Sequence, residues 1–323
     1  MTLYTKPHLS FSEQVDLLTQ RGLSIGDRAG AAHLLGVIGY YRLSGYWYPY
    51  RRPLHGRAGR DDRFVDGATF ERVVRLYDMD RRLKLMVLDA IERVEVALRV
   101  KIGYTLGRRG AYAHLHPQNL DGQFTRSHGS QQRSTYDGWL QKILTAQARS
   151  SEDFVVHFQD KYGGRLPVWV LTEIMDFGSM TYLYQGLKSA DRNEIARTLD
   201  ILDARGTGNG GALSNWMRVL NYVRNVCAHH SRLWNRNLVN QIAPRHLATI
   251  PSLAYLSQQR GDAHFRIYST LCILAFLLSR IEPGSEWSVP VQRMLTEELP
   301  GCGRGLQELG FPADWAGHAP WVK

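Results

Sequence analysis

The segment from Arg224 to Arg236 holds the residues of this 323-residue chain whose types and spacing best suit chemistry. Arg224 and His229 stand five positions apart, and Asn225 lies between them. Arginine stays charged at any biological pH, and its planar fork fits phosphate oxygens. Histidine can move a proton near neutrality. The trio therefore predicts metal-independent RNA cleavage, with Arg224 binding the phosphate, His229 transferring the proton and Asn225 orienting either partner.

The spacing by itself is a weak signal, because Arg109 and His114 are also five positions apart. That second pair sits in a glycine-interrupted segment, whereas the first lies in a stretch with no Gly or Pro from Leu213 to Arg236. Apolar residues recur there at helical spacing, so we expect one continuous helix over 213–236.

Winding this stretch at about 100° per residue separates its two histidines. His230 falls within an apolar stripe, so we expect it to be buried. The opposite stripe has no acidic residue and forms a cationic hydrogen-bonding face suited to RNA phosphates. It consists of Arg218, Asn221, Asn225, His229, Arg232 and Arg236. An ordinary solvated polar face is the alternative.

Arg224 and His229 point about 140° apart on an ideal helix. One helix therefore presents them awkwardly to one phosphate. A second copy, packed antiparallel about a two-fold axis, would bring two Arg and two His around a shared groove. We therefore expect a homodimer.

Two other groups are candidates for supporting roles. The loop-rich segment 107–134 is basic and could contact an RNA backbone, unless it is simply a solvated loop. Its cationic residues include Arg108, Arg109, Arg126, His128 and Arg133. Glu95 and Arg99 are spaced for an i,i+4 ion pair, and a carboxylate that orients Arg224 or His229 is the alternative role for Glu95.

An aromatic block lies between residues 40 and 50, next to Arg42, Arg51 and Arg52. It comprises Tyr40, Tyr41, Tyr46, Trp47, Tyr48 and Tyr50. We expect these rings to pack in the core, with base stacking as the alternative.

Composition restricts the class of protein. The net charge of +10 and the pI near 9.6 favour a polyanionic partner. The three cysteines form no C-x2-C pair, so we expect no zinc or disulfide framework, no metal and no cofactor. The N-terminus lacks a signal-peptide pattern, and the most apolar run, 267–281, is too short to span a bilayer. We therefore expect a cytoplasmic protein without a membrane partner.

Helical patterns dominate the chain, and they predict an all-α fold. The segment 51–67 should be a loop or short hairpin, and Gly206 to Gly211 should be a linker. Helices are expected at 11–20 (capped by Ser10 or Ser12), 31–48, 70–106, 136–148, 151–160, 166–187, 191–202, 213–236 and 264–281.

Several ordered blocks resemble the bacterial abortive-infection (Abi) proteins of the HEPN superfamily. The Arg224-x4-His229 spacing resembles the ribonuclease motif of that superfamily, and the string 221–236 resembles its Abi members. Further similar blocks are Tyr40–Pro49, Leu76–Leu83 with Ala90–Arg99, and Leu166–Val170 with Phe177–Met180. The resemblance covers roughly residues 10 to 240.

This resemblance implies a HEPN-like helical bundle with additional N- and C-terminal helices. Residues 1–67 would pack on a core of residues 68–240, and 241–323 would form an extension, unless all three are one continuous domain. It also implies dimerisation and RNA cleavage to 2′,3′-cyclic phosphates in phage defence or as a toxin, with a small structured RNA restraining some relatives. Where some HEPN toxins carry a modifiable Tyr two residues after the His, this chain has Ser231.

Two other functions are compatible with the same residues. An RNA-binding protein would use Arg224 and His229 to hold a structured small RNA in a defence or toxin–antitoxin complex without cutting it. A helical interaction protein would have no nucleic-acid role.

Overall fold

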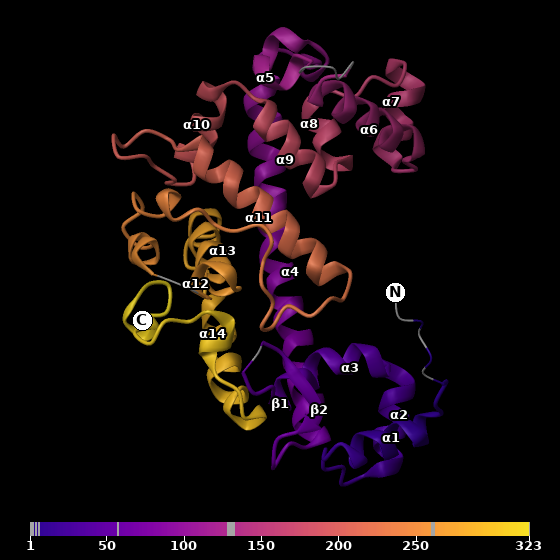
Figure 1. The fold of residues 1–323 in the computed structure, drawn as a ribbon. Coiled ribbons are helices and arrows are strands. Elements are labelled where there is room, and N and C mark those ends of the chain that lie inside the picture. The colour runs from indigo at the N-terminus through magenta and orange to yellow at the C-terminus, as the bar shows by residue number, and fades with distance from the viewer. Residues whose placement is uncertain are drawn as a thin grey trace. The chain divides into compact units, whose positions relative to one another are not determined.

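The computed structural model describes residues 3, 5, 7–56, 58–127, 133–259 and 262–322, so His128 lies outside the described residues. The fold is mainly helical, which confirms the all-α prediction (Figure 1). The helices are α1 Phe11–Gln20, α2 Arg28–Ile38, α3 Tyr40–Trp47, α4 Phe70–Gly107, α5 Gly122–Thr125, α6 Thr135–Arg149, α7 Asp153–Tyr162, α8 Val168–Leu171, α9 Phe177–Gly186, α10 Ser189–Arg197, α11 Gly210–Ala228, α12 Asp262–Phe265, α13 Tyr268–Ile281 and α14 Ser288–Glu298.

The segment 51–67 contains the short hairpin that the sequence allowed. Strands β1 (Arg51–Pro53) and β2 (Arg60–Phe64) pair antiparallel, with Arg51 opposite Phe64. They form the one sheet found among the described residues.

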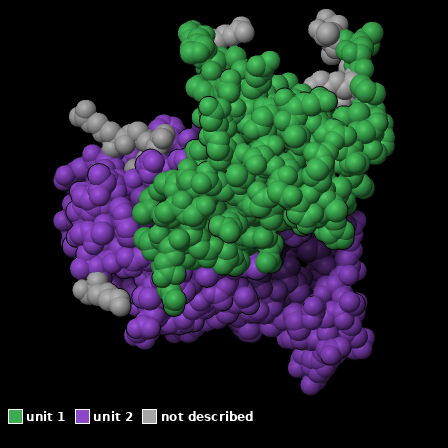
Figure 2. Space-filling view, turned by 90° about the horizontal axis from the view of Figure 1, so that it is seen from below, with its two compact units in different colours: residues 1–84, 293–306 green, residues 85–292, 307–323 purple. Residues whose placement is uncertain are grey.

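The chain divides into two compact units, coloured separately in Figure 2. Unit 1 comprises residues 1–84 and 293–306, and unit 2 comprises residues 85–292 and 307–323. Helix α4 contributes its first part to unit 1 and the rest to unit 2. The division into segments 1–67, 68–240 and 241–323 stays a prediction.

Local sequence signals account for the start of α1. Ser10 accepts a hydrogen bond from the backbone of Glu13, whose carboxylate accepts one from the backbone of Ser10. This reciprocal capping box satisfies backbone donors that the helix leaves without partners. The predicted bounds 11–20 are confirmed.

The core of unit 2 is built around α11, which packs against α9, α10 and α13 (Figure 1). The apolar stripe predicted on α11 is buried over the length of the helix, at Trp216, Leu220, Val223 and Cys227. Trp216 meets Phe276 of α13 edge-on, with ring centroids 5.9 Å apart. This packing fixes which face of α11 remains accessible.

The prediction that α11 continues to Arg236 is wrong, because the helix ends at Ala228. His230 donates its backbone N–H to Cys227, and Ser231 donates to Val226, both at 3.0 Å. This Schellman arrangement needs a left-handed residue, usually glycine, and His230 adopts it with φ 57°. The chain then turns and buries Leu233 and Trp234.

The expected helix over 166–187 is also interrupted. It is split into α8 and α9 by a turn of 3-10 helix and by Asp176, whose side chain caps α9 by accepting from the backbone of Ser179 at 2.6 Å. Similarly, the expected helix over 264–281 is divided into α12 and α13.

Trp169 of α8 lies directly on the C-terminal turns of α4. A Cβ added at Gly103 would lie 3.0 Å from the Trp169 Cα, and one at Gly107 would lie 2.9 Å from the indole ring. The two glycines therefore make room for α8 against α4.

The hydropathy of the helices bears on membrane association. Within the part of the chain that the structure describes, no helix combines the length and apolar character needed to cross a bilayer.

Candidate phosphate-binding site at the end of α11

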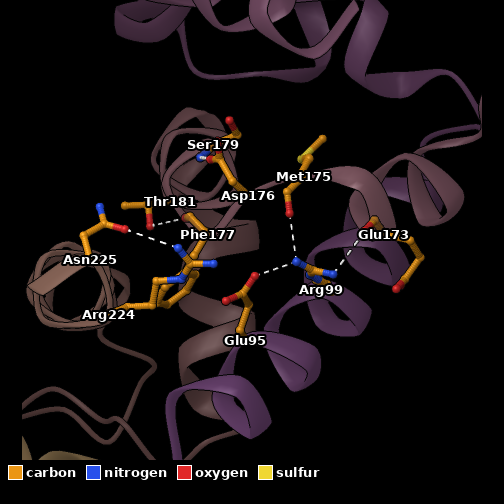
Figure 3. Close-up of polar contacts among 10 residues, drawn as sticks. All are labelled: Glu95, Arg99, Glu173, Met175, Asp176, Phe177, Ser179, Thr181, Arg224 and Asn225. Carbon is orange, nitrogen blue, oxygen red and sulfur yellow. Dashed lines mark hydrogen bonds and ion pairs between the residues drawn. The ribbon is translucent and has the colours of Figure 1, made fainter. Parts of the chain in front are cut away.

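Arg224 and Asn225 lie on the last turn of α11, beside α4 and the start of α9 (Figure 3). Arg224 is half-buried and lines a hollow of about 520 Å³ together with Glu92, Glu95 and Arg99 of α4. Its guanidinium donates to the Asn225 side-chain oxygen at 3.5 Å, which is at the outer limit for a hydrogen bond. Arg224 is thus held loosely by its neighbour.

Arg99 is anchored far more firmly than Arg224. It pairs with Glu95 at 2.5 Å and donates to the backbone carbonyls of Glu173 (3.1 Å) and Met175 (2.8 Å). The predicted i,i+4 pair between Glu95 and Arg99 is confirmed. These contacts tie the segment before α9 to α4.

Glu95 also faces the candidate site. Figure 3 shows its carboxylate pointing into the space between the guanidinium groups of Arg99 and Arg224. Its side chain is only 12% exposed. The alternative role of Glu95, orienting Arg224, stays a prediction, because Arg99 is the partner within ion-pair distance among the described residues.

Arg224 differs from Arg99, the other arginine that lines this hollow, in having no counter-ion among the described residues. Among the residues that the structure describes, no carboxylate lies within 4 Å of its guanidinium, whereas Arg99 pairs with Glu95. A half-buried guanidinium without a counter-ion can bind a phosphate through its N–H donors.

His229 and His230 are both exposed at the end of α11. His229 is the C-cap residue, and its backbone donates to Asn225 at 3.0 Å. The expected burial of His230 is wrong, because the Schellman turn rotates the chain out of the helical register in which His230 would have faced the core. His229 is the histidine that directly continues the helix bearing Arg224.

The predicted polar stripe is brought together only in part. Arg218 is exposed on α11, and Asn221 faces the start of α9, where an added Gly178 Cβ would lie 3.5 Å from its amide. Arg232 and Arg236 follow the helix end and do not continue its face. Arg236 instead folds back, donating to the Tyr222 hydroxyl at 3.1 Å and to the Arg232 carbonyl at 3.5 Å.

The cationic residues 108 and 109 lie near the opposite end of α11. Arg108 pairs with Glu194 at 2.5 Å, and Arg109 forms a forked pair with Asp191. Glu194 and Asp191 both belong to α10. The hydrogen bond from Arg108 holds the pKa of Glu194 below its ordinary value. Asn193 of α10 binds the first residue of α11, Gly210, at 3.0 Å. The length of α11, about 28 Å, therefore separates this region from His229.

Two other cations of segment 107–134, Arg126 and Arg133, are more accessible. Arg126 and Arg133 are exposed, and Arg126 donates to the Gly122 carbonyl at 3.1 Å.

His114, which belongs to the second Arg–His pair in the sequence, is buried, and burial lowers its pKa to about 4. That pair is therefore no counterpart of Arg224 and His229.

Three residues around the site were not singled out from the sequence. Lys142 pairs with Asp176 at 2.7 Å beside the start of α9, and Tyr222 positions Arg236. Burial alone would raise the pKa of Asp176, but hydrogen bonds from Lys142 and Ser179 hold it below its ordinary value. These contacts join residues distant in sequence, so no spacing signal points to them.

A family model described as Abi-like protein matches residues 33–235, well over half of the chain. The chain belongs to this Abi-like family. Membership associates it with abortive infection, a response of bacteria to phage. The matched range includes α4, α9, α11 and every residue discussed above from Glu95 to His229. Neither the curated proteins nor the solved structures compared with this Abi-like chain gave a match.

Proposed function

We propose that this Abi-like protein is a metal-independent endoribonuclease that acts on RNA in the cytoplasm during phage defence. The Arg224-x4-His229 spacing, which resembles the HEPN ribonuclease motif, supplies the two groups that such cleavage requires. The observation that carries the proposal is the guanidinium of Arg224, which lacks a counter-ion among the described residues while the neighbouring Arg99 is neutralised by Glu95.

In the proposed reaction the RNA 2′-oxygen attacks the adjacent phosphorus and the bond to the 5′-oxygen breaks. His229 takes the proton from the 2′-hydroxyl or gives one to the departing 5′-oxygen. Arg224 binds the phosphate and stabilises the charge that builds on its oxygens, while Asn225 orients the phosphate or His229. The products are a 2′,3′-cyclic phosphate and a 5′-hydroxyl.

The proposed RNA path includes the exposed Arg218 and the neighbouring Asn221 on α11, with Arg232 and Arg236 beyond the helix end. Arg126 and Arg133 are additional candidates, since both are exposed. Arg108 and Arg109 are weaker candidates, because each is already bound to a carboxylate.

The divergence of Arg224 and His229 supports a homodimer with α11 near the two-fold axis. A phosphate would then use Arg224 from one protomer and His229 from the other. Mixing an Arg224→Ala protein with a His229→Asn protein should restore activity in part, because some mixed dimers regain one intact site. Sedimentation of an active monomer would contradict this arrangement.

Incubation of purified protein with RNA in excess EDTA tests the proposed activity. We expect cleavage, with 3′ ends that acid opens to mixed 2′- and 3′-monophosphates. His229→Asn should abolish cleavage. His230→Asn is the matched control, because it makes the same change one residue away, and asparagine tolerates the left-handed backbone there. Equal activity of the two variants would remove His229 from the mechanism.

The competing function is an RNA-binding protein that holds a structured small RNA without cutting it. The angle of about 140° between Arg224 and His229 favours it, because one chain does not direct both groups at one phosphate. Tight RNA binding without cleavage, by wild-type protein and by His229→Asn alike, would establish this alternative.

A further inference from the structure

A cavity of about 590 Å³ lies within unit 1 and takes no part in the function proposed above. Its walls come from α1, from the junction of α2 and α3, and from both strands of the hairpin. Sites for small molecules typically have volumes of about 300–1,000 Å³. The cavity is therefore large enough for one small ligand.

One part of the cavity wall is cationic. Arg21 and Arg51 both bind Asp62, each with a nitrogen–oxygen distance of 3.0 Å. The arginine side chains are only 20% and 15% exposed, while Asp62 is 59% exposed. Two guanidinium groups thus share one carboxylate, which leaves one positive charge in excess.

Arg51 retains hydrogen-bonding capacity as well as charge. Its Nε is buried and has no acceptor among the described residues. A buried donor without a partner is costly, so the local structure around Arg51 is not fully satisfied by the described residues. Arginine guanidinium groups bind phosphate oxygens through paired N–H donors.

Another part of the wall is aromatic and accessible. Tyr41 is 77% exposed and Tyr48 is 43% exposed, and both line the cavity. The aromatic block predicted to pack in the core is therefore divided, since Tyr41 and Tyr48 are exposed and Tyr40 is half-buried. Core packing is confirmed for Tyr46, Trp47 and Tyr50. Exposed tyrosine rings offer flat surfaces on which a nucleobase can stack.

We propose that this cavity binds a single nucleotide, with the base against Tyr41 and Tyr48 and the phosphate at Arg21 and Arg51. A free nucleoside monophosphate and the phosphorylated 5′ end of an RNA share this chemistry. The volume suits one nucleotide. The site is separate from Arg224 and His229, so it stands or falls independently of RNA cleavage.

Calorimetric titration of the full chain tests the site, with His229→Asn protein used so that RNA stays intact. The probes are adenosine 5′-monophosphate, adenosine and inorganic phosphate. We expect saturable binding of the monophosphate. Adenosine and phosphate should each bind at least about fivefold more weakly, since each lacks one of the two recognised groups.

Two variants with matched controls locate the binding. Tyr41→Ala and Arg51→Gln should each weaken binding by about tenfold. Tyr104→Ala removes a tyrosine that is 69% exposed on α4, and Arg52→Gln neutralises the neighbouring arginine, which does not line the cavity. Both controls should bind like the parent protein. Tyr41 is mostly exposed, so its variant decides the matter even if Arg51→Gln fails to fold.

Short oligoribonucleotides with a 5′-phosphate or a 5′-hydroxyl identify the source of the ligand. Tyr41-dependent preference for the 5′-phosphate assigns the site to RNA ends, whereas binding of the monophosphate alone assigns it to free nucleotide. Absence of saturable binding by every phosphorylated probe would overturn the proposal. Binding that survives Tyr41→Ala unchanged would do so too.

Discussion

Ser231 donates its backbone N–H to the carbonyl of Val226 at 3.0 Å, and this bond closes the end of α11. It gives two adjacent histidines different backbone conformations. His229 continues the helix as its C-cap, whereas His230 takes the left-handed turn. The position of His229 beyond Arg224 thus depends on a turn made without glycine.

The stability of this turn is the first prediction. His230→Gly should change the free energy of unfolding by less than about 1 kcal/mol, because glycine adopts the left-handed region readily. His230→Val should be less stable than His230→Gly by at least about 1 kcal/mol, since a β-branched residue is strained there. Urea denaturation measures both. Equal midpoints would mean that residue 230 is not held at positive φ.

A second prediction concerns the planar fork of Arg224. Arg224→Lys should lose activity by about 10²–10³-fold, nearly as much as Arg224→Ala, because lysine keeps the charge but not the paired donors. Single-turnover cleavage gives the rates. Arg149→Lys, at an exposed arginine of α6 outside the proposed RNA path, is the control and should remain close to wild type. Full activity of Arg224→Lys would mean that Arg224 contributes only its positive charge and not its paired N–H donors.

A third prediction concerns Arg99, which joins α4 to the segment before α9. Arg99→Gln should lower the free energy of unfolding by about 1–3 kcal/mol, because it leaves Glu95 and two backbone carbonyls without their donor. Denaturant midpoints test this. Arg293→Gln breaks another i,i+4 pair, with Glu297, but Arg293 is 76% exposed, so a change below about 1 kcal/mol is expected. Similar losses in both variants would contradict the anchoring role.

A fourth prediction concerns pH. Burial lowers the pKa of His114 from 6.5 to about 4. Between these pH values His114 is therefore protonated in the unfolded chain but mostly neutral in the folded chain. Stability should therefore be full above pH 6.5 and fall by about 3 kcal/mol as the pH approaches 4. Thermal midpoints across this range, compared with those of His114→Leu, isolate the effect. A variant with the same acid sensitivity as wild type would exclude His114 as its source.

A fifth prediction separates structural from RNA-binding cations. Arg109→Gln should destabilise the fold, because Asp191 is only 7% exposed, yet leave the salt dependence of RNA binding unchanged. Arg133→Gln should instead reduce the log–log salt slope by about 0.7, as loss of one phosphate contact does on single-stranded RNA. Filter binding at several salt concentrations distinguishes them. The reverse pattern would place RNA at Arg109.

The sequence was sufficient at some places where the structure depends on nearby residues. The bounds of α1 followed from Ser10 and Glu13, and the buried stripe of α11 followed from helical periodicity. It failed at the end of α11, because the turn at His230 carries no glycine and is driven by burial of Leu233 and Trp234. It also could not reveal that Arg109 is neutralised by Asp191, which lies 82 positions away.

Trp169 packs on Gly103 and Gly107, and this contact stabilises the last turns of α4. Each glycine within a helix destabilises that helix by about 1 kcal/mol relative to alanine. The two glycines therefore give this end of α4 a low helix propensity. Packing of the Trp169 indole supplies the stabilisation that these helical turns lack on their own. A peptide containing only the sequence of α4 should therefore fray from Gly103 onward, and these turns should become helical only once Trp169 has docked.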